Sequence, residues 1–163
     1  MSVGDRIRWL LITSGGLGCS PFAPGTVGTL GGVLLAVTLQ WALSEHVVLA
    51  WGIAAVVLFV WGCMQTAFVA RTWPKEDPGH FVLDEVVGYL VTVIVYALLA
   101  QQLPYAFGHM AAFFAFRVFD VLKIQPARKL EDLPGALGIM ADDQMAGAYA
   151  GLSLWLLLPL LHG

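Results

Sequence analysis

The stretch Phe81-Val82-Leu83-Asp84-Glu85-Val86-Val87-Gly88 opens an apolar run that continues to Leu103 without a further charge. Two adjacent carboxylates, Asp84 and Glu85, therefore stand at the mouth of a segment with the composition of a membrane helix. Ionisable groups at the edge of hydrocarbon are costly and are functional suspects by default. The stretch predicts a membrane helix that begins at a functional site.

The rest of the 163-residue chain shares this membrane character. Hydrophobic residues make up 59% of it and charged residues 12%, about half the charged share of soluble domains. Such a chain could not cover a water-exposed surface, so we expect one integral-membrane domain over residues 1–163. No basic stripe with interleaved aromatic residues is present, which argues against a nucleic-acid partner. The segments without Asp, Glu, Lys or Arg are 9–44, 46–70, 86–116 and 144–163.

These segments predict an all-α fold, a small polytopic bundle of about five membrane-embedded helices. Crossing the hydrocarbon takes about 20 residues, and the first apolar segment is short for that purpose. Residues 1–13 are expected to form an additional amphipathic helix at the membrane surface, with Arg6 and Arg8 toward the headgroups. The five expected spans are 27–43, 47–70, 86–103, a segment from 105 to the region of 117–123, and 145–161.

On this topology all the basic residues fall on one side of the membrane. The positive-inside rule then places the N-terminus in the cytoplasm and the C-terminus outside. The candidate acids share the cytoplasmic side, so one end of the bundle carries the chemistry. The basic residues are Arg6, Arg8, Arg71, Lys75, Arg117, Lys123, Arg128 and Lys129.

Small residues recur four apart in two of the expected spans. Gly28 and Gly32 form one pair, and Gly147 and Gly151 form the other. This spacing lets helix backbones approach closely. We interpret the pairs as packing positions within the bundle, with a homodimer face as the alternative.

Two acidic doublets, Asp84–Glu85 and Asp142–Asp143, each precede an expected span. Helix N-termini favour negative charge, so capping could explain one acid of each doublet. Capping does not explain two doublets and Asp120 at one membrane depth, because clustered carboxylates repel unless a cation is present. Ligand sets made only of oxygen favour a hard ion such as Mg²⁺. We predict both doublets as Mg²⁺ ligands, with Asp120 as a further ligand or a base.

Arg117, Asp120 and Lys123 follow an i, i+3, i+6 spacing on one face of the fourth span. Salt bridging within the helix and snorkelling to the headgroups would explain them structurally. The functional interpretation is an anion clamp, since Arg offers a planar fork to phosphate oxygens and Lys a point charge. The predicted catalytic residues are Asp84, Asp120, Arg117 and Lys123. The five acids outnumber the two bases, so a phosphate would be repelled unless a metal were bound first.

The loop 24–29 (PGTVGT) supplies a further candidate for phosphate binding. Backbone N–H groups at a helix N-terminus bind anions, and the hydroxyls of Thr26 and Thr29 could join them. A purely structural helix start is the alternative. His80, between Asp77 and Asp84, is either a base or an incidental loop histidine.

These segments, taken in order, resemble the signatures of the phosphatidylglycerophosphatase A family. The first signature corresponds to residues 18–30 (GCSPFAPGTVGTL) and the second to Asp77-Pro78 followed by 82–88 (VLDEVVG). The third and fourth correspond to 116–123 (FRVFDVLK), 134–138 (PGALG) and 142–147 (DDQMAG). The chain departs from the family in two loops. Ile124-Gln125-Pro126 stands where the family has Pro-x-Pro, and Ala136 replaces a glycine.

The resemblance implies a Mg²⁺-dependent phosphatase of the bacterial inner membrane. It would convert phosphatidylglycerophosphate to phosphatidylglycerol and phosphate at the cytoplasmic face, with water or an aspartyl carboxylate (Asp84 or Asp120) as nucleophile. A small ion- or proton-coupled carrier is the rival hypothesis, and it predicts acids at mid-span. A purely structural membrane subunit is the third, and it leaves the acidic doublets unexplained.

Overall fold

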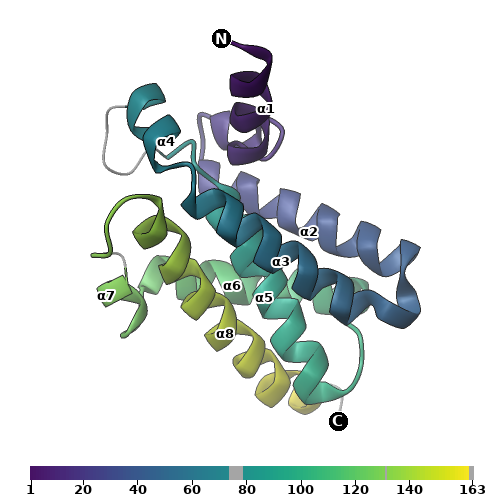
Figure 1. Cartoon of the computed structure of the whole chain (residues 1–163). Coiled ribbons are helices and arrows are strands. Elements are labelled where there is room, and N and C mark those ends of the chain that lie inside the picture. Colours follow the sequence, from purple (N-terminus) through teal and green to yellow (C-terminus); the bar gives the residue numbers. More distant parts are fainter. Residues whose placement is uncertain (74–78, 131, 162–163) are drawn as a thin grey trace.

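The structure, a computed structural model, describes residues 1–73, 79–130 and 132–161. Every regular element of those residues is a helix, which confirms the all-α prediction (Figure 1). Two short 3₁₀ turns, η1 (Leu17–Cys19) and η2 (Ser44–His46), join the early helices. The helices are α1 (Val3–Ile12), α2 (Pro24–Ala42), α3 (Val47–Cys63), α4 (Thr66–Thr72), α5 (Leu83–Ala100), α6 (Ala106–Leu122), α7 (Ala127–Leu130) and α8 (Ala136–Leu161).

Helix α5 is the centre of the bundle. It packs against α2, α3, α6 and α8, and most of its residues are buried, whereas α2 and α3 are largely exposed (Figure 1). Its apolar residues Val86, Val87, Leu90 and Val93 are almost fully covered. The helix that starts with Asp84 and Glu85 is thus the one around which the others assemble.

Within the described residues, three helical segments are long and apolar enough to cross a membrane. They are Pro24–Ala42, Ser44–Cys63 and Leu83–Ala100. The expected count of about five spans is therefore not confirmed. The outer surface of the bundle is nevertheless apolar, as lipid contact requires. Large exposed hydrophobic side chains on α2, α3, α6 and α8 include Leu34, Trp41, Leu49, Val56, Phe114 and Leu157.

The expected second span, 47–70, is two helices. Helix α3 ends at Cys63, and α4 begins at Thr66 after a short turn. The side chain of Thr66 explains part of this break, because its Oγ1 accepts a hydrogen bond of 3.0 Å from the Ala136 N–H at the start of α8. Helix α4 is thereby tied to α8 and does not extend α3 as a straight rod.

The residues between the expected fourth and fifth spans, 124–143, were expected to form a polar loop, and this expectation is wrong in part. The segment contains α7 and the first turns of α8, which begins at Ala136. Asp142 and Asp143 therefore lie within a helix and do not precede one. Gly135, with φ of +65°, supplies the left-handed turn before α8.

The glycine pairs pack inside the bundle, as interpreted. A Cβ atom added to Gly32 would lie 3.1 Å from the Val86 Cα of α5. One added to Gly151 would lie 2.6 Å from the Thr92 carbonyl oxygen, also on α5. The contact at Gly151 leaves no room for a side chain and the one at Gly32 leaves very little, so these glycines let α2 and α8 approach the central helix. A homodimer stays a prediction.

Helices α1, α4 and α7 lie at one end of the bundle, away from the α5–α6 connection (Figure 1). Arg71 of α4 donates to Asp5 of α1 across 3.3 Å, and the Val82 N–H donates to the Ile12 carbonyl across 3.0 Å. The described basic residues of these three helices therefore share an end, as the topology predicted. Lys75 and Asp77 lie outside the described residues.

Candidate active site

A cavity of about 950 Å³ opens at the end of the bundle where α4 lies. Its walls come from the starts of α2, α5 and α8, from α4, and from the last turns of α6. All five acids and both bases of the predicted site line it. The charged residues on its walls are Asp84, Glu85, Asp120, Asp132, Asp142, Asp143, Arg117 and Lys123.

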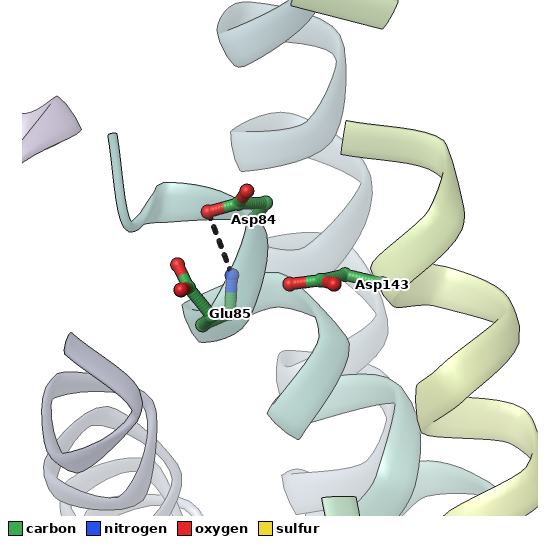
Figure 2. A group of neighbouring side chains, drawn as sticks. All are labelled: Asp84, Glu85 and Asp143. Atoms are coloured by element: carbon green, nitrogen blue, oxygen red, sulfur yellow. Dashed lines mark hydrogen bonds between the residues drawn. The ribbon is translucent and has the colours of Figure 1, made fainter. Parts of the chain in front are cut away.

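Three of the acids form a compact group. One carboxylate oxygen from each of Asp84, Glu85 and Asp143 lies within 4.8 Å of the others. Figure 2 shows the Asp143 side chain reaching from α8 toward the first turn of α5, which carries the other two. Two unit charges at this separation repel by about 3 kcal/mol at an effective dielectric constant of about 20. A cation between the three carboxylates would remove that repulsion.

Two oxygens of this group are buried and lack a hydrogen-bond partner among the described residues. They are Glu85 Oε2 and Asp143 Oδ2. Leaving such an oxygen without a partner costs the full desolvation penalty of the group. Because every atom that could ligate a metal ion here is a carboxylate oxygen, the group fits a hard divalent cation. The residues present are therefore compatible with a divalent metal ion, and the expected ion is Mg²⁺.

Asp142 was expected as a fourth ligand, but it points elsewhere. Its Oδ2 accepts a hydrogen bond of 3.0 Å from Lys123 Nζ, and its Oδ1 accepts one of 3.0 Å from the Asp143 N–H. Neighbouring residues on an α-helix project about 100° apart. Asp142 and Asp143 therefore face different parts of the cavity, which the doublet in the sequence did not reveal.

Arg117 connects the acid group to the end of α6. Its Nη1 forms an ion pair with Asp120 Oδ2 and lies 3.8 Å from Glu85 Oε1. The Arg117 Nε is buried and has no hydrogen-bond partner among the described residues. This guanidinium therefore retains a donor for a further anion.

Lys123 ends α6 in a left-handed conformation, with φ of +45°. That conformation costs a residue with a side chain about 1–2 kcal/mol, and such strain often marks functional positions. Its N–H still closes the last turn by donating to the Phe119 carbonyl across 3.0 Å. The turn ends the helix where the Lys123 side chain can reach Asp142 of α8.

Gly25 brings the start of α2 against the charged group. A Cβ atom added there would collide with Glu85 Oε1 and would lie 3.1 Å from Arg117 Nη2. Ala23, two residues earlier in the chain, has a φ of +44° and also lines the cavity. Only glycine lets the helix terminus approach the carboxylate and the guanidinium this closely.

The two threonines of the same loop contribute differently from the expectation. Thr29 is fully buried, and its hydroxyl donates to the Gly25 carbonyl across 2.8 Å. The described walls of the cavity include neither Thr26 nor Thr29. Thr29 thus stabilises the first turn of α2, which corrects the expectation that its hydroxyl faces a phosphate.

His80 positions a loop in this structure. Its Nδ1 lies 3.0 Å from the Gly18 carbonyl oxygen, and its ring lies beside that of Trp73. The cavity wall also includes residues that the sequence did not mark: Thr66 of α4, Trp73 directly after α4, and Asp132 before α8. These stood in segments assigned to a span or a loop, and no spacing marked them.

All five acids line the cavity at one end of the bundle, with Asp142 and Asp143 within the first turns of α8 and the other three at helix ends. Asp84 and Glu85 are in the first turn of α5, and Asp120 is near the last residue of α6. The carrier hypothesis required carboxylates at mid-span, so the geometry disfavours it.

Comparison with known proteins gives a consistent result. A family profile described as "Phosphatidylglycerophosphatase A" matches residues 10–158. A protein of Bacteroides thetaiotaomicron with the provisional name phosphatidylinositol-3-phosphatase is 36% identical over 86% of this chain and 87% of its own. Two proteins named phosphatidylglycerophosphatase A are each 33% identical. The match to the Haemophilus influenzae protein covers 86% of this chain and 82% of that protein. The match to the Escherichia coli protein covers 85% of this chain and 77% of that protein. No solved structure matches the chain.

Proposed function

The chain belongs to the phosphatidylglycerophosphatase A family, and on that premise we propose that it hydrolyses phosphatidylglycerophosphate to phosphatidylglycerol and phosphate. The observation that supports this most is the meeting of Asp84, Glu85 and Asp143 with Arg117 and Lys123 in one cavity of a membrane bundle. A phosphomonoester of a lipid needs this combination: a cationic clamp, a site for a counter-ion and access from the bilayer.

Arg117 and Lys123 bind the phosphoryl oxygens in this proposal. Both are held in place by acids, Arg117 by Asp120 and Lys123 by Asp142. Arg117 offers the planar guanidinium fork that suits phosphate oxygens. The pairing keeps the two cations oriented before the substrate arrives, which lowers the cost of binding.

Asp84, Glu85 and Asp143 would hold Mg²⁺, which supplies a positive charge that offsets the charge on the transferred phosphoryl group. Water is the proposed nucleophile. Asp120, which forms an ion pair with Arg117, is the proposed acceptor of the water proton. Asp142 would not touch the substrate and would hold the Lys123 side chain in position.

The cavity also has an apolar side that suits a lipid. Side chains from α4, α6 and α8 line it, among them Val69, Val121 and Ile139, and Phe81 precedes α5. A polar floor beside an apolar wall fits an amphiphile whose headgroup carries the phosphate. A soluble phosphate ester would leave the apolar side without a partner.

The proposed location is the bacterial inner membrane, with the cavity facing the cytoplasm. The basic residues Arg71, Arg128 and Lys129 lie on helices at the cavity end. Cytoplasmic loops carry such an excess of Lys and Arg. The relatives in the comparison are bacterial.

Phosphate release by the purified full-length protein in mixed micelles tests the activity and its substrate. The substrates are phosphatidylglycerophosphate, phosphatidylinositol 3-phosphate and water-soluble glycerol 3-phosphate, each with Mg²⁺. We expect the first to be hydrolysed fastest and the soluble ester slowest. Faster release from the inositol lipid would replace the proposed substrate, and no release from either lipid would overturn the proposed activity.

A further inference from the structure

Helix α1 has one face that is apolar and another that packs against the protein. Val3, Ile7, Leu10 and Leu11 recur at i, i+4, i+7 and i+8, so they share one face. Ile12 and Thr13, at the end of the helix, are fully buried against the body of the protein. The face that packs on the protein is therefore separate from the apolar face.

The apolar face is uncovered. Val3 is 76% exposed and Ile7 54%, and Leu10 and Leu11 are exposed as well. An apolar stripe along a short helix at the end of a membrane protein would be unfavourable in water. It fits the boundary between headgroups and acyl chains.

Arginines flank this face on both sides. Arg6 is one residue before Ile7 and Arg8 one residue after it, and both are exposed. On a helix they project about 100° to either side of Ile7. Long basic side chains in this arrangement can reach anionic headgroups while the apolar face enters the bilayer.

A third arginine connects α1 to the cavity wall. Arg71 of α4 pairs with Asp5 at 3.3 Å, and the guanidinium groups of Arg71 and Arg8 both lie over the ring of Phe68. The hydrogen bond with Ser2, followed by the charges of Arg71 and Arg8, lowers the pKa of Asp5. Helix α4 itself lines the cavity through Val69 and Ala70, and Trp73 follows directly after it.

We propose that α1 is a docking surface for anionic phospholipid, with Val3, Ile7, Leu10 and Leu11 in the acyl boundary and Arg6, Arg8 and Arg71 on the headgroups. The charge of the flanking residues favours lipid over a second copy of the chain, because a second α1 would bring like charges together. This inference rests on the surface of α1 and does not depend on which phosphate ester the cavity takes.

Depth measurements on the full-length protein in vesicles test the proposal. A spin label is attached to Ile7→Cys or Leu10→Cys in a Cys19→Ser/Cys63→Ala background, with Arg128→Cys on α7 as the aqueous reference. Collision rates are measured with oxygen, which concentrates in lipid, and with a water-soluble nickel chelate. The vesicles are phosphatidylcholine alone or phosphatidylcholine mixed with phosphatidylserine.

We expect the labels at 7 and 10 to collide mainly with oxygen and the label at 128 mainly with nickel. Phosphatidylserine should deepen the label at 10, and each of Arg6→Gln and Arg8→Gln should lower the equilibrium constant for membrane insertion of α1 by about fivefold. Nickel collisions at 7 and 10 that equal those at 128 would overturn the proposal. If the labels at 7 and 10 collide with neither oxygen nor nickel and show dipolar broadening from a second label, the face binds a second copy of the chain. That result would also overturn the proposal.

Discussion

Gly88 of α5 lies against Gly147 of α8, and each glycine is one helical turn beyond an acid of the cavity. A Cβ atom on Gly147 would collide with the Gly88 carbonyl oxygen, and one on Gly88 would lie 2.8 Å from the Asp143 carbonyl oxygen. Asp84 precedes Gly88 by four residues, and Asp143 precedes Gly147 by four. The close contact of the two helices thus sets the distance between the carboxylates that would share a cation.

Gly147→Ala should therefore separate α5 from α8 and weaken the site. Overpacking of this kind costs about 1–3 kcal/mol of stability, and the carboxylates should hold the metal less tightly. Thermal unfolding in detergent, with and without Mg²⁺, measures both effects. Gly52→Ala on α3 is the matched control, because a Cβ atom there meets nothing within 4 Å. Equal behaviour of the two variants would contradict the role of this helix contact.

Asp143→Asn should abolish metal-dependent stabilisation while the protein still folds, since the amide keeps the shape and removes the charge. A ligand at about 100 times its dissociation constant stabilises a protein by about 2.7 kcal/mol, and this increment should be lost. The Mg²⁺-induced shift in melting temperature is the measurement. Asp132→Asn, at an exposed position on the cavity wall, should keep the shift. A normal shift in the Asp143 variant would remove that residue from the metal site.

Arg117→Lys should lower kcat/KM for the lipid substrate by about tenfold to a hundredfold, because a hydrogen bond to a charged group contributes about 1.5–3 kcal/mol. Lysine keeps the charge and loses the planar fork. Phosphate release at several substrate concentrations measures the change. Arg128→Lys on α7, outside the described walls of the cavity, serves as the control. Unchanged kinetics in the Arg117 variant would mean that the guanidinium does not bind the phosphate.

Gly25→Ala should reduce activity by about a hundredfold, the cost of a displacement of about 1 Å in a catalytic group. The added methyl group would push on Glu85 and Arg117. Gly4→Ala on α1, where the nearest atom is 3.8 Å away, should leave activity unchanged. Phosphate release, with circular dichroism to confirm folding, checks the pair. Full activity in the Gly25 variant would show that the start of α2 does not shape the site.

Much of this arrangement could be predicted from the sequence. The charge-free segments predict a helical membrane protein, and the doublets at Asp84 and Asp142 predict an acidic site at one end. The direction of each side chain could not be predicted, because it depends on where a helix begins. The start of α8 at Ala136 places Asp143 toward α5 and Asp142 toward Lys123.

The hydrogen-bond partners of two threonine hydroxyls could not be predicted from the sequence either. The composition of 47–70 suits one span, yet the Thr66 hydroxyl accepts from the start of α8, some 70 residues away in sequence. The Thr29 hydroxyl could have faced a phosphate, but it is satisfied within its own helix. The first outcome depends on a tertiary contact that no local pattern reports. The second is a local bond to the carbonyl four residues earlier, one of the two partners that the hydroxyl could have taken.

We propose that Asp84, Glu85 and Asp143 hold the divalent cation required to hydrolyse a lipid phosphomonoester. The most direct measurement is phosphate release from phosphatidylglycerophosphate by chelator-treated, full-length protein as Mg²⁺ is added back. We expect no release without metal, a saturable return of activity with Mg²⁺, and no return in the Asp143→Asn variant. Full activity in the presence of excess chelator, or full recovery in that variant, would contradict it.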